Sequence, residues 1–188
     1  MGDGWSRRVS CIEICCNDPV TAFTRYQHVM GKCFYALLHN NSVHILHSDH
    51  GAKLLRGNCP TFWYSFNGRC YKYVSASMAW ADAELHCVSQ GANLASIHSL
   101  EEHQFVKVLI SNFDPTEGYT WIGLTDLHKE GGWMWSDGTP VDFTYWTSNQ
   151  PENMGGNEHC VHKNFGMKWI DSRCSESFPF VCATRCSQ

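Results

Sequence analysis

The 188-residue sequence lacks the features that mark several large classes of protein. It has no run of 18 or more apolar residues, so we predict no membrane span. It has no GxSxG elbow, no HExxH pair and no Walker loop, so we predict that the protein is not an enzyme. Positive charge is not in excess, because 14 Lys and Arg stand against 18 Asp and Glu. That balance gives no reason to expect nucleic acid as a partner.

Eleven cysteines are the most informative feature of the composition. No CxxC pair occurs among them, which weighs against a structural zinc site. Cytosolic thiols are kept reduced, so this density of cysteine indicates disulfides and an extracellular, secreted protein. The N-terminus has no apolar segment of the length that a recognisable signal peptide needs, and we expect the secreted chain to start elsewhere.

The chain changes character near residue 57. Residues 1–57 show no sustained period of 2 or 3.6, whereas turn residues bound every later segment. Gly57, Asn58 and Pro60 interrupt the pattern. We therefore predict an N-terminal extension over 1–57, a folded domain over 58–184 and a tail over 185–188.

The predicted domain opens with local signals for a hairpin and two helices. Asn67–Gly68 between aromatic segments predicts a hairpin turn. The next segment predicts a helix capped by Ser77 and ended by Gly91. Ser99 and Glu102 form the sequence pattern of a capping box, which predicts the start of a second helix.

After Pro115 the sequence favours short aromatic strands. These are YTWIGL, GWMWSDG, MKWID and FPFVCA. Two helices followed by such strands indicate the α+β class. Most tryptophans of this half are expected in the core, because alternate aromatic residues on strands bury large apolar areas.

Several separated motifs resemble the C-type lectin-like domain family over residues 59–183. They are, in chain order, AWADAELHC, WIGL, SDGTPVDFTYW, the QPE…NEHC loop and FPFVC. The stretch ANLASIHSLEE is also similar to fish secreted lectins, which include galactose-specific forms, and to type II antifreeze proteins. The resemblance implies two helices, two small antiparallel sheets and a long-loop region, stapled by disulfides.

The resemblance also implies how the cysteines pair. The implied bridges are Cys59–Cys70, Cys87–Cys182 and Cys160–Cys174. Each bridge is expected to stabilise the fold by roughly 2–4 kcal/mol. The cysteines left over are Cys11, Cys15, Cys16, Cys33 and Cys186. Their odd number leaves open an oligomer, linked by disulfides or held non-covalently.

The loop NQPENMGGNEHC contains residue types that the family uses to bind Ca²⁺. Calcium takes about 6–8 hard oxygen ligands. The resemblance implies that the ligands are Gln150, Glu152, Glu158 and Asp171. It also implies a cis bond before Pro151, which X-Pro bonds can adopt. Ile170 stands where the family has Asn, and it has no donor atom for a metal ion.

A weaker second Ca²⁺ site is implied at Asp126 and Glu130. The other acids of that family site correspond to Asn153 and His159, which carry no negative charge at neutral pH. With so few carboxylates, we expect the second site to be empty or of low affinity.

The order of amide and acid in the loop points to a class of sugar. Gln150 followed by Glu152 keeps the order of galactose-binding family members. We therefore expect a calcium-dependent lectin that binds galactose-type glycans, including microbial ones in innate-immune recognition, through the four Ca²⁺ ligands. Trp146, the tryptophan nearest the loop, is the one expected to contact sugar.

Other readings of the loop stay open. Ice binding, as in type II antifreeze proteins, ranks lower because the sequence has no repetitive Thr array. A calcium-independent domain that binds a protein partner is the second alternative, for which Ile170 is the main hint. Glu152 and Glu158 also resemble the paired carboxylates of a glycosidase. Their place beside a ligand-type Gln favours ion chelation.

Overall fold

The computed structural model describes residues 54–163 and 168–186 in full, together with the backbone of four short strands nearer the N-terminus. These strands are β1 (His28–Val29), β2 (Lys32–Cys33), β3 (Tyr35–His39) and β4 (Ser42–Leu46). They pair as two antiparallel hairpins, β1 with β2 and β3 with β4. Most of the predicted extension, with Cys11, Cys15 and Cys16, lies outside the described residues.

One mixed sheet organises the remainder of the chain. Its main path follows the order β11-β10-β8-β12-β6-β5. The strands of this path are β5 (Tyr64–Phe66), β6 (Arg69–Met78), β8 (Thr120–Thr125), β10 (Cys160–Lys163), β11 (Trp169–Ser172) and β12 (Phe178–Arg185). Short β7 (Asn93–Leu94) pairs with β12, and β9 (Met134–Trp135) pairs with β8.

Two antiparallel halves meet at a single parallel pairing in this sheet. β12 and β8 run parallel, with Phe180 opposite Trp121, while the other strand pairs are antiparallel. The implied fold of two helices and small antiparallel sheets is confirmed, and the parallel contact joins the sheets into one. Gly123 of the WIGL motif sits where a Cβ would lie 2.6 Å from the carbonyl oxygen of Leu94, so this position requires a residue without a side chain.

The first helix begins later than its predicted cap. α1 spans Trp80–Ser89, and its N-cap Ala79 makes no side-chain hydrogen bond. The prediction of Ser77 as the cap is wrong, because β6 stays paired with β12 as far as Met78 and keeps Ser77 in the strand. Gly91 follows the helix with a φ of +71°, as predicted for the residue that ends it.

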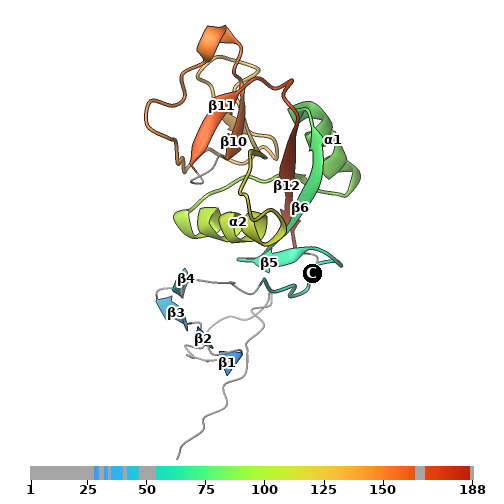
Figure 1. Ribbon diagram of the computed structural model, residues 1–188, viewed down its shortest axis with the longest axis vertical. Coiled ribbons are helices and arrows are strands. Elements are labelled where there is room, and N and C mark those ends of the chain that lie inside the picture. Colours follow the sequence, from blue (N-terminus) through green and yellow to red (C-terminus); the bar gives the residue numbers. More distant parts are fainter. Residues whose placement is uncertain are drawn as a thin grey trace, which may run out of the picture.

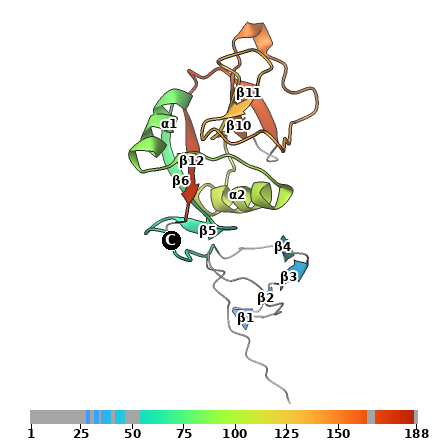
Figure 2. The same cartoon turned by 180° about the vertical axis from the view of Figure 1, so that it is seen from behind.

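The second helix begins with the predicted cap. α2 spans Leu100–Phe113, and the Ser99 hydroxyl accepts a hydrogen bond of 3.1 Å from the backbone N–H of Glu102. The Glu102 carboxylate receives the N–H of His98 at 2.6 Å and the Arg69 guanidinium at 2.7 Å. The cap of α2 is thereby tied to β6. Figures 1 and 2 show α1 beside the β6–β12 pair and α2 crossing the sheet near its lower end.

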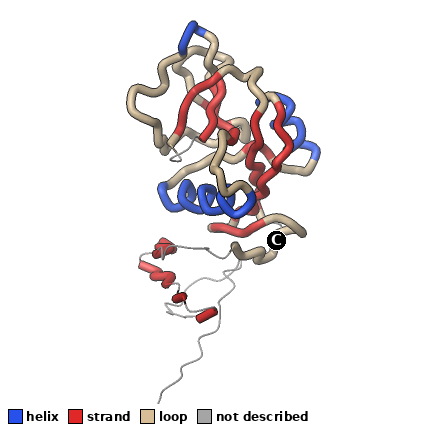
Figure 3. The backbone as a smooth tube through the Cα atoms, in the orientation of Figure 1, coloured by secondary structure: helices blue, strands red, loops and turns tan. Residues whose placement is uncertain are grey.

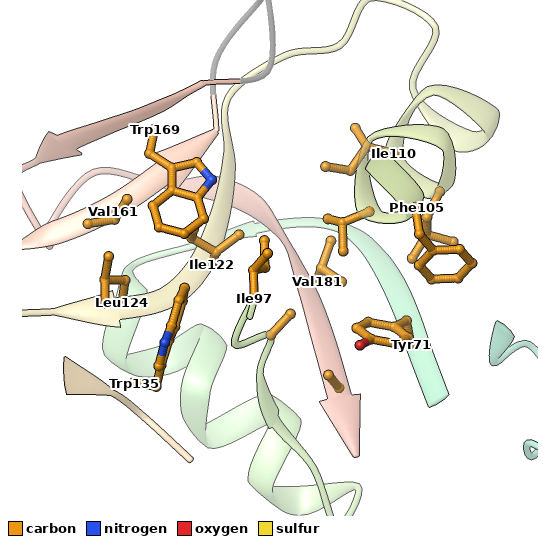
Figure 4. Close-up of a cluster of buried hydrophobic side chains, with 14 residues drawn as sticks. Tyr71, Ile97, Phe105, Ile110, Ile122, Leu124, Trp135, Val161, Trp169 and Val181 are labelled. Carbon is orange, nitrogen blue, oxygen red and sulfur yellow. The ribbon is translucent and has the colours of Figure 1, made fainter. Parts of the chain in front are cut away.

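Aromatic residues of the strands make up much of the buried core. Trp121, Trp135 and Trp169 are fully buried, as predicted for strand tryptophans. Figure 4 shows Trp135 and Trp169 with Val161 and Ile122 in one part of the core, while Phe105 projects from α2 towards Tyr71 in another. The hairpin turn at Asn67–Gly68 has positive φ at both residues, which matches the predicted turn.

Three disulfides staple the described part of the chain. They are Cys59–Cys70, Cys87–Cys182 and Cys160–Cys174, the pairs that the resemblance implies. The sulfur of Cys186 lies 3.5 Å from that of Cys70. No helix within the described residues combines the length and apolar character that crossing a membrane requires.

A long stretch with little regular structure separates β9 from β10. It holds only the short 3₁₀ turn η1 (Met154–Gly156), and Figure 3 shows it as a looping tan tube at the end of the molecule away from β5. This stretch is the long-loop region that the resemblance implies. It carries the predicted ligands of the main Ca²⁺ site except Asp171, whereas Asp126 and Glu130 of the second site precede β9.

Candidate functional site

The loop over 149–159 is fixed to the sheet at both ends. Before it, the backbone N–H of Thr147 donates to the carbonyl oxygen of Trp169 in β11 at 2.9 Å. After it, Cys160 enters β10 and is bridged to Cys174. The peptide bond between Gln150 and Pro151 is cis, as predicted. The side chains of the loop are therefore presented from a frame that β10 and β11 hold in place.

Asp171 anchors this loop from the sheet. Its side chain comes from β11 and is 2% exposed. One carboxylate oxygen accepts the backbone N–H of Glu152 at 3.2 Å, and the other accepts that of Asn153 at 2.7 Å. The carboxylate thus fixes the backbone on the C-terminal side of Pro151. Each oxygen keeps a lone pair that these bonds do not use.

Gln150 and Glu152 face each other across Pro151. The amide nitrogen of Gln150 donates to Oε1 of Glu152 at 2.8 Å. Because the nitrogen of the Gln150 amide makes that bond, its other terminal atom is the oxygen. This oxygen, Oε1 of Gln150, is buried with no hydrogen-bond partner among the described residues. A buried acceptor left unpaired costs about 1–3 kcal/mol. The amide oxygen of Gln150 is therefore a candidate ligand atom to which the described residues supply no partner.

Glu158 turns toward its own loop. Its Oε2 accepts the backbone N–H of Met154 at 2.9 Å, and its own N–H donates to Oδ1 of Asn153 at 3.0 Å. Within the described ranges, Glu152, Glu158 and Asp171 do not form a group whose ligand atoms all lie within 4.8 Å of one another. The structure brings Gln150, Glu152 and Asp171 together through hydrogen bonds, and it directs Glu158 to the tip of the loop.

Asp126 and Glu130, the pair predicted for the second Ca²⁺ site, form with His159 a tighter group than the three carboxylates of the main site do. Asp126 follows β8 and is 1% exposed, and its Oδ1 lies 2.9 Å from Nδ1 of His159. Oε2 of Glu130 lies 3.5 Å from the same nitrogen and accepts the amide of Asn153 at 2.5 Å. His159 was not predicted as a ligand, because the family has an acid at this position and a neutral histidine carries no charge. The nearness of His159 to Asp126 depends on the β8–β10 pairing, which was not predicted.

Trp146 packs within a tryptophan cluster beside the loop. Its ring centroid lies 5.0 Å from that of Trp133 and 6.0 Å from that of Trp169, and it is partly buried. Ile170 is half-buried in β11, opposite His162 of β10. The role of Trp146 in contacting sugar stays a prediction.

Two buried basic groups, Lys163 of β10 and His103 of α2, are in contact. The Nζ of Lys163 in β10 is fully enclosed and donates to the carbonyl oxygen of His103 at 3.2 Å. Burial, with the nearby positive charge of Lys107, lowers the pKa of Lys163 to about 7. Burial, followed by the charges of Lys163 and Lys107, lowers the pKa of His103 to about 3. The neutral ring of His103 accepts the indole N–H of Trp169 at 3.3 Å.

A family model, related sequences and solved structures all place this chain in the same family. The model of the lectin C-type domain matches residues 76–184. The lactose-binding lectin l-2 of Anguilla japonica is 43% identical over 145 residues, which cover 73% of this chain and 86% of the relative. The type-2 ice-structuring protein of Osmerus mordax is 43% identical over 129 residues, which cover 66% of this chain and 70% of the relative. The solved structure of herring type II antifreeze protein superposes with a TM-score of 0.64 at 39% identity, covering 69% of this chain and 100% of that one.

Proposed function

Because the chain belongs to the lectin C-type domain family, we propose that it is a carbohydrate-binding lectin that uses its 149–159 loop to bind Ca²⁺ and a galactose-type sugar. The observation that carries this proposal is the buried amide oxygen of Gln150, which has no hydrogen-bond partner in the described part of the chain. The same loop carries the carboxylates of Glu152 and Glu158, and the carboxylate of Asp171 anchors its backbone. Oxygen donors of this kind are the ligands that Ca²⁺ prefers.

Four residues would hold the ion. They are Gln150, Glu152, Glu158 and Asp171, and Glu158 would have to turn from the N–H of Met154 towards the other three to join them. Ca²⁺ bound among them would supply a positive centre for two neighbouring hydroxyls of a sugar. Asp171 positions the loop through two backbone N–H groups, at 3.2 and 2.7 Å. The exposed Glu152 carboxylate would accept a hydrogen bond from a sugar hydroxyl, and the Gln150 amide nitrogen would donate one. Ile170 contributes no ligand, so water is needed to complete the shell.

The galactose class follows from the order of the two side chains that flank Pro151. The amide of Gln150 precedes the acid of Glu152, as in galactose-binding family members. The name of the Anguilla japonica relative, which is 43% identical, gives lactose as its ligand, and lactose is a galactoside. Together with the three disulfides, which suit an oxidising compartment, these features support an extracellular lectin for galactose-type glycans, including those on microbes.

Ice binding is the second candidate. The relative named as an ice-structuring protein is 43% identical, as similar as the lactose-binding one. The loop tip also presents apolar surface, since Met154 there is 59% exposed and two glycines follow it. Thermal hysteresis measured with and without EDTA tests this candidate. Hysteresis in a protein with no affinity for sugar would replace the lectin proposal.

Retention on an immobilised galactose resin tests the proposed function. We expect the protein to be retained in the presence of Ca²⁺ and released by EDTA. Glu158→Gln should abolish retention, while the matched control Glu176→Gln, on an exposed turn outside the loop, should be retained like the parent. Failure to bind in Ca²⁺, or binding that EDTA does not reverse, contradicts the proposal. The second outcome would favour a calcium-independent domain with a different partner.

A further inference from the structure

The group of Asp126, Glu130 and His159 is a compact set of three possible metal ligands outside the loop site. Their ligand atoms all lie within 4.8 Å of one another. Nδ1 of His159 is 2.9 Å from Oδ1 of Asp126 and 3.5 Å from Oε2 of Glu130. Ligand bonds of about 2.1 Å in a tetrahedral arrangement place neighbouring donor atoms about 3.4 Å apart. The two distances lie on either side of that value, and a metal ion would take the place of the hydrogen that His159 and Asp126 now share.

The scaffold holds two of the three ligands in fixed positions. The backbone N–H of Asp126 donates to the carbonyl oxygen of His159 at 3.1 Å, and the Thr125 hydroxyl donates to the same oxygen at 2.6 Å. The next residue, Cys160, is bridged to Cys174. Asp126 and His159 are therefore joined through their backbones before any ligand arrives. Such support is what a specific metal site needs.

The turn that carries the third ligand is also ordered by Asp126. Its Oδ2 accepts the N–H of Gly131 at 2.7 Å, and its carbonyl oxygen accepts the N–H of Lys129 at 2.9 Å. These bonds enclose Glu130 within the turn. The Glu130 side chain is 61% exposed, so an ion can reach the group from solvent.

The donor atoms select the type of metal. An imidazole nitrogen suits Zn²⁺ and other late first-row dications, whereas Ca²⁺ prefers an all-oxygen shell. Asn153, the neighbouring amide, already uses its oxygen for the N–H of Glu158 and presents its nitrogen to Glu130. One imidazole with two carboxylates, and water at an open position, is a donor set for Zn²⁺.

We propose that Asp126, Glu130 and His159 form a binding site for a transition-metal dication, with Zn²⁺ as the preferred ion. The site includes His159 at the end of the 149–159 loop but shares none of the four ligands proposed for Ca²⁺. The two proposals therefore stand independently, and each can fail without the other.

Zinc titration of the full chain by calorimetry tests this site. His44, His47 and His50 are replaced by Gln in all samples, because closely spaced histidines are alternative zinc ligands. We expect one equivalent of Zn²⁺ to bind, His159→Gln to abolish that event and Glu130→Gln to weaken it by about tenfold or more. Glu130 is exposed, so its variant should fold like the parent, which near-ultraviolet circular dichroism checks.

A second histidine–carboxylate pair provides the matched control. Nδ1 of His98 lies 2.7 Å from Oδ1 of Asp142, but in the described part of the chain this pair belongs to no three-ligand group. His98→Gln should leave zinc binding unchanged, and millimolar Ca²⁺ should not displace the bound zinc. Equal zinc binding by the His159 and Glu130 variants and the parent would overturn the proposal, as would no zinc uptake or displacement by Ca²⁺. Galactose retention of Glu130→Gln, which should persist, separates this result from the lectin proposal.

Discussion

Replacing Lys163 with Met should change how the stability of the fold depends on pH. The Nζ of Lys163 is fully buried and, among the described residues, donates to one acceptor, the carbonyl oxygen of His103 at 3.2 Å. Burial lowers the pKa of this amine from 10.5 to about 7. Between these two values the unfolded chain binds a proton that the folded chain does not. The free energy of unfolding therefore falls as the pH falls from 10.5 towards 7, and it levels off below the folded pKa.

The size of this effect follows from the two pKa values. One pKa unit corresponds to about 1.4 kcal/mol, and integration of the linkage between pH 9 and pH 7 gives a loss of about 2 kcal/mol. Methionine has a similar length and no charge, so it removes this dependence. Lys163→Met should thus gain stability over the parent, and the gain should be about 2 kcal/mol larger at pH 7 than at pH 9.

Urea unfolding at pH 7, 8 and 9, followed by tryptophan fluorescence, measures this difference. Lys129→Met serves as the control, because the Lys129 side chain is exposed and its removal should leave the pH profile unchanged. Equal gains at pH 7 and pH 9 would refute the reasoning about the buried amine. A variant less stable than the parent at every pH would show that the bond to His103 outweighs the cost of burying the charge.

Three further predictions each concern one residue. His103→Gln should reduce the loss of stability on acidification from pH 6.5 to about 3. The folded pKa of His103 is about 3, so only the unfolded chain takes up a proton at this site in that range. The midpoint of urea unfolding, measured across these pH values, gives the size of the reduction. Ser99→Ala should cost about 1 kcal/mol in urea unfolding through loss of the α2 cap, and Ser99→Thr should recover most of it. Asp171→Asn should weaken galactose retention by tenfold or more, because it removes a carboxylate ligand and one acceptor for the loop backbone; unchanged retention would exclude Asp171 from the site.

The features that the sequence predicted correctly are either local or tied to the family motifs. The Asn67–Gly68 turn and the Ser99 cap depend on residues within a few positions of one another, so their geometry can be inferred from residue type alone. The disulfides and the cis bond at Pro151 followed from the resemblance to a family.

The features that the sequence did not predict depend on pairing between distant strands. Ser77 is a good capping residue, but the pairing of β6 with β12 keeps it in the strand. Strand β10 was missed because all four of its residues are buried, so it has no alternation of polar and apolar positions. Without β10, His159 could not be placed beside Asp126 from residue types alone. The orientation of Glu158 toward Met154 was likewise not predictable, because it is set by the conformation of the loop tip.

Calcium titration of the full chain by calorimetry, compared with Glu158→Ala, tests the central claim most directly. The proposed function predicts that the parent binds Ca²⁺ at the loop and that the variant loses this binding while keeping its fold. An added galactoside should then bind the calcium-loaded parent only. No Ca²⁺ uptake by the parent, or identical uptake by both proteins, would show that the loop over 149–159 is not an ion site.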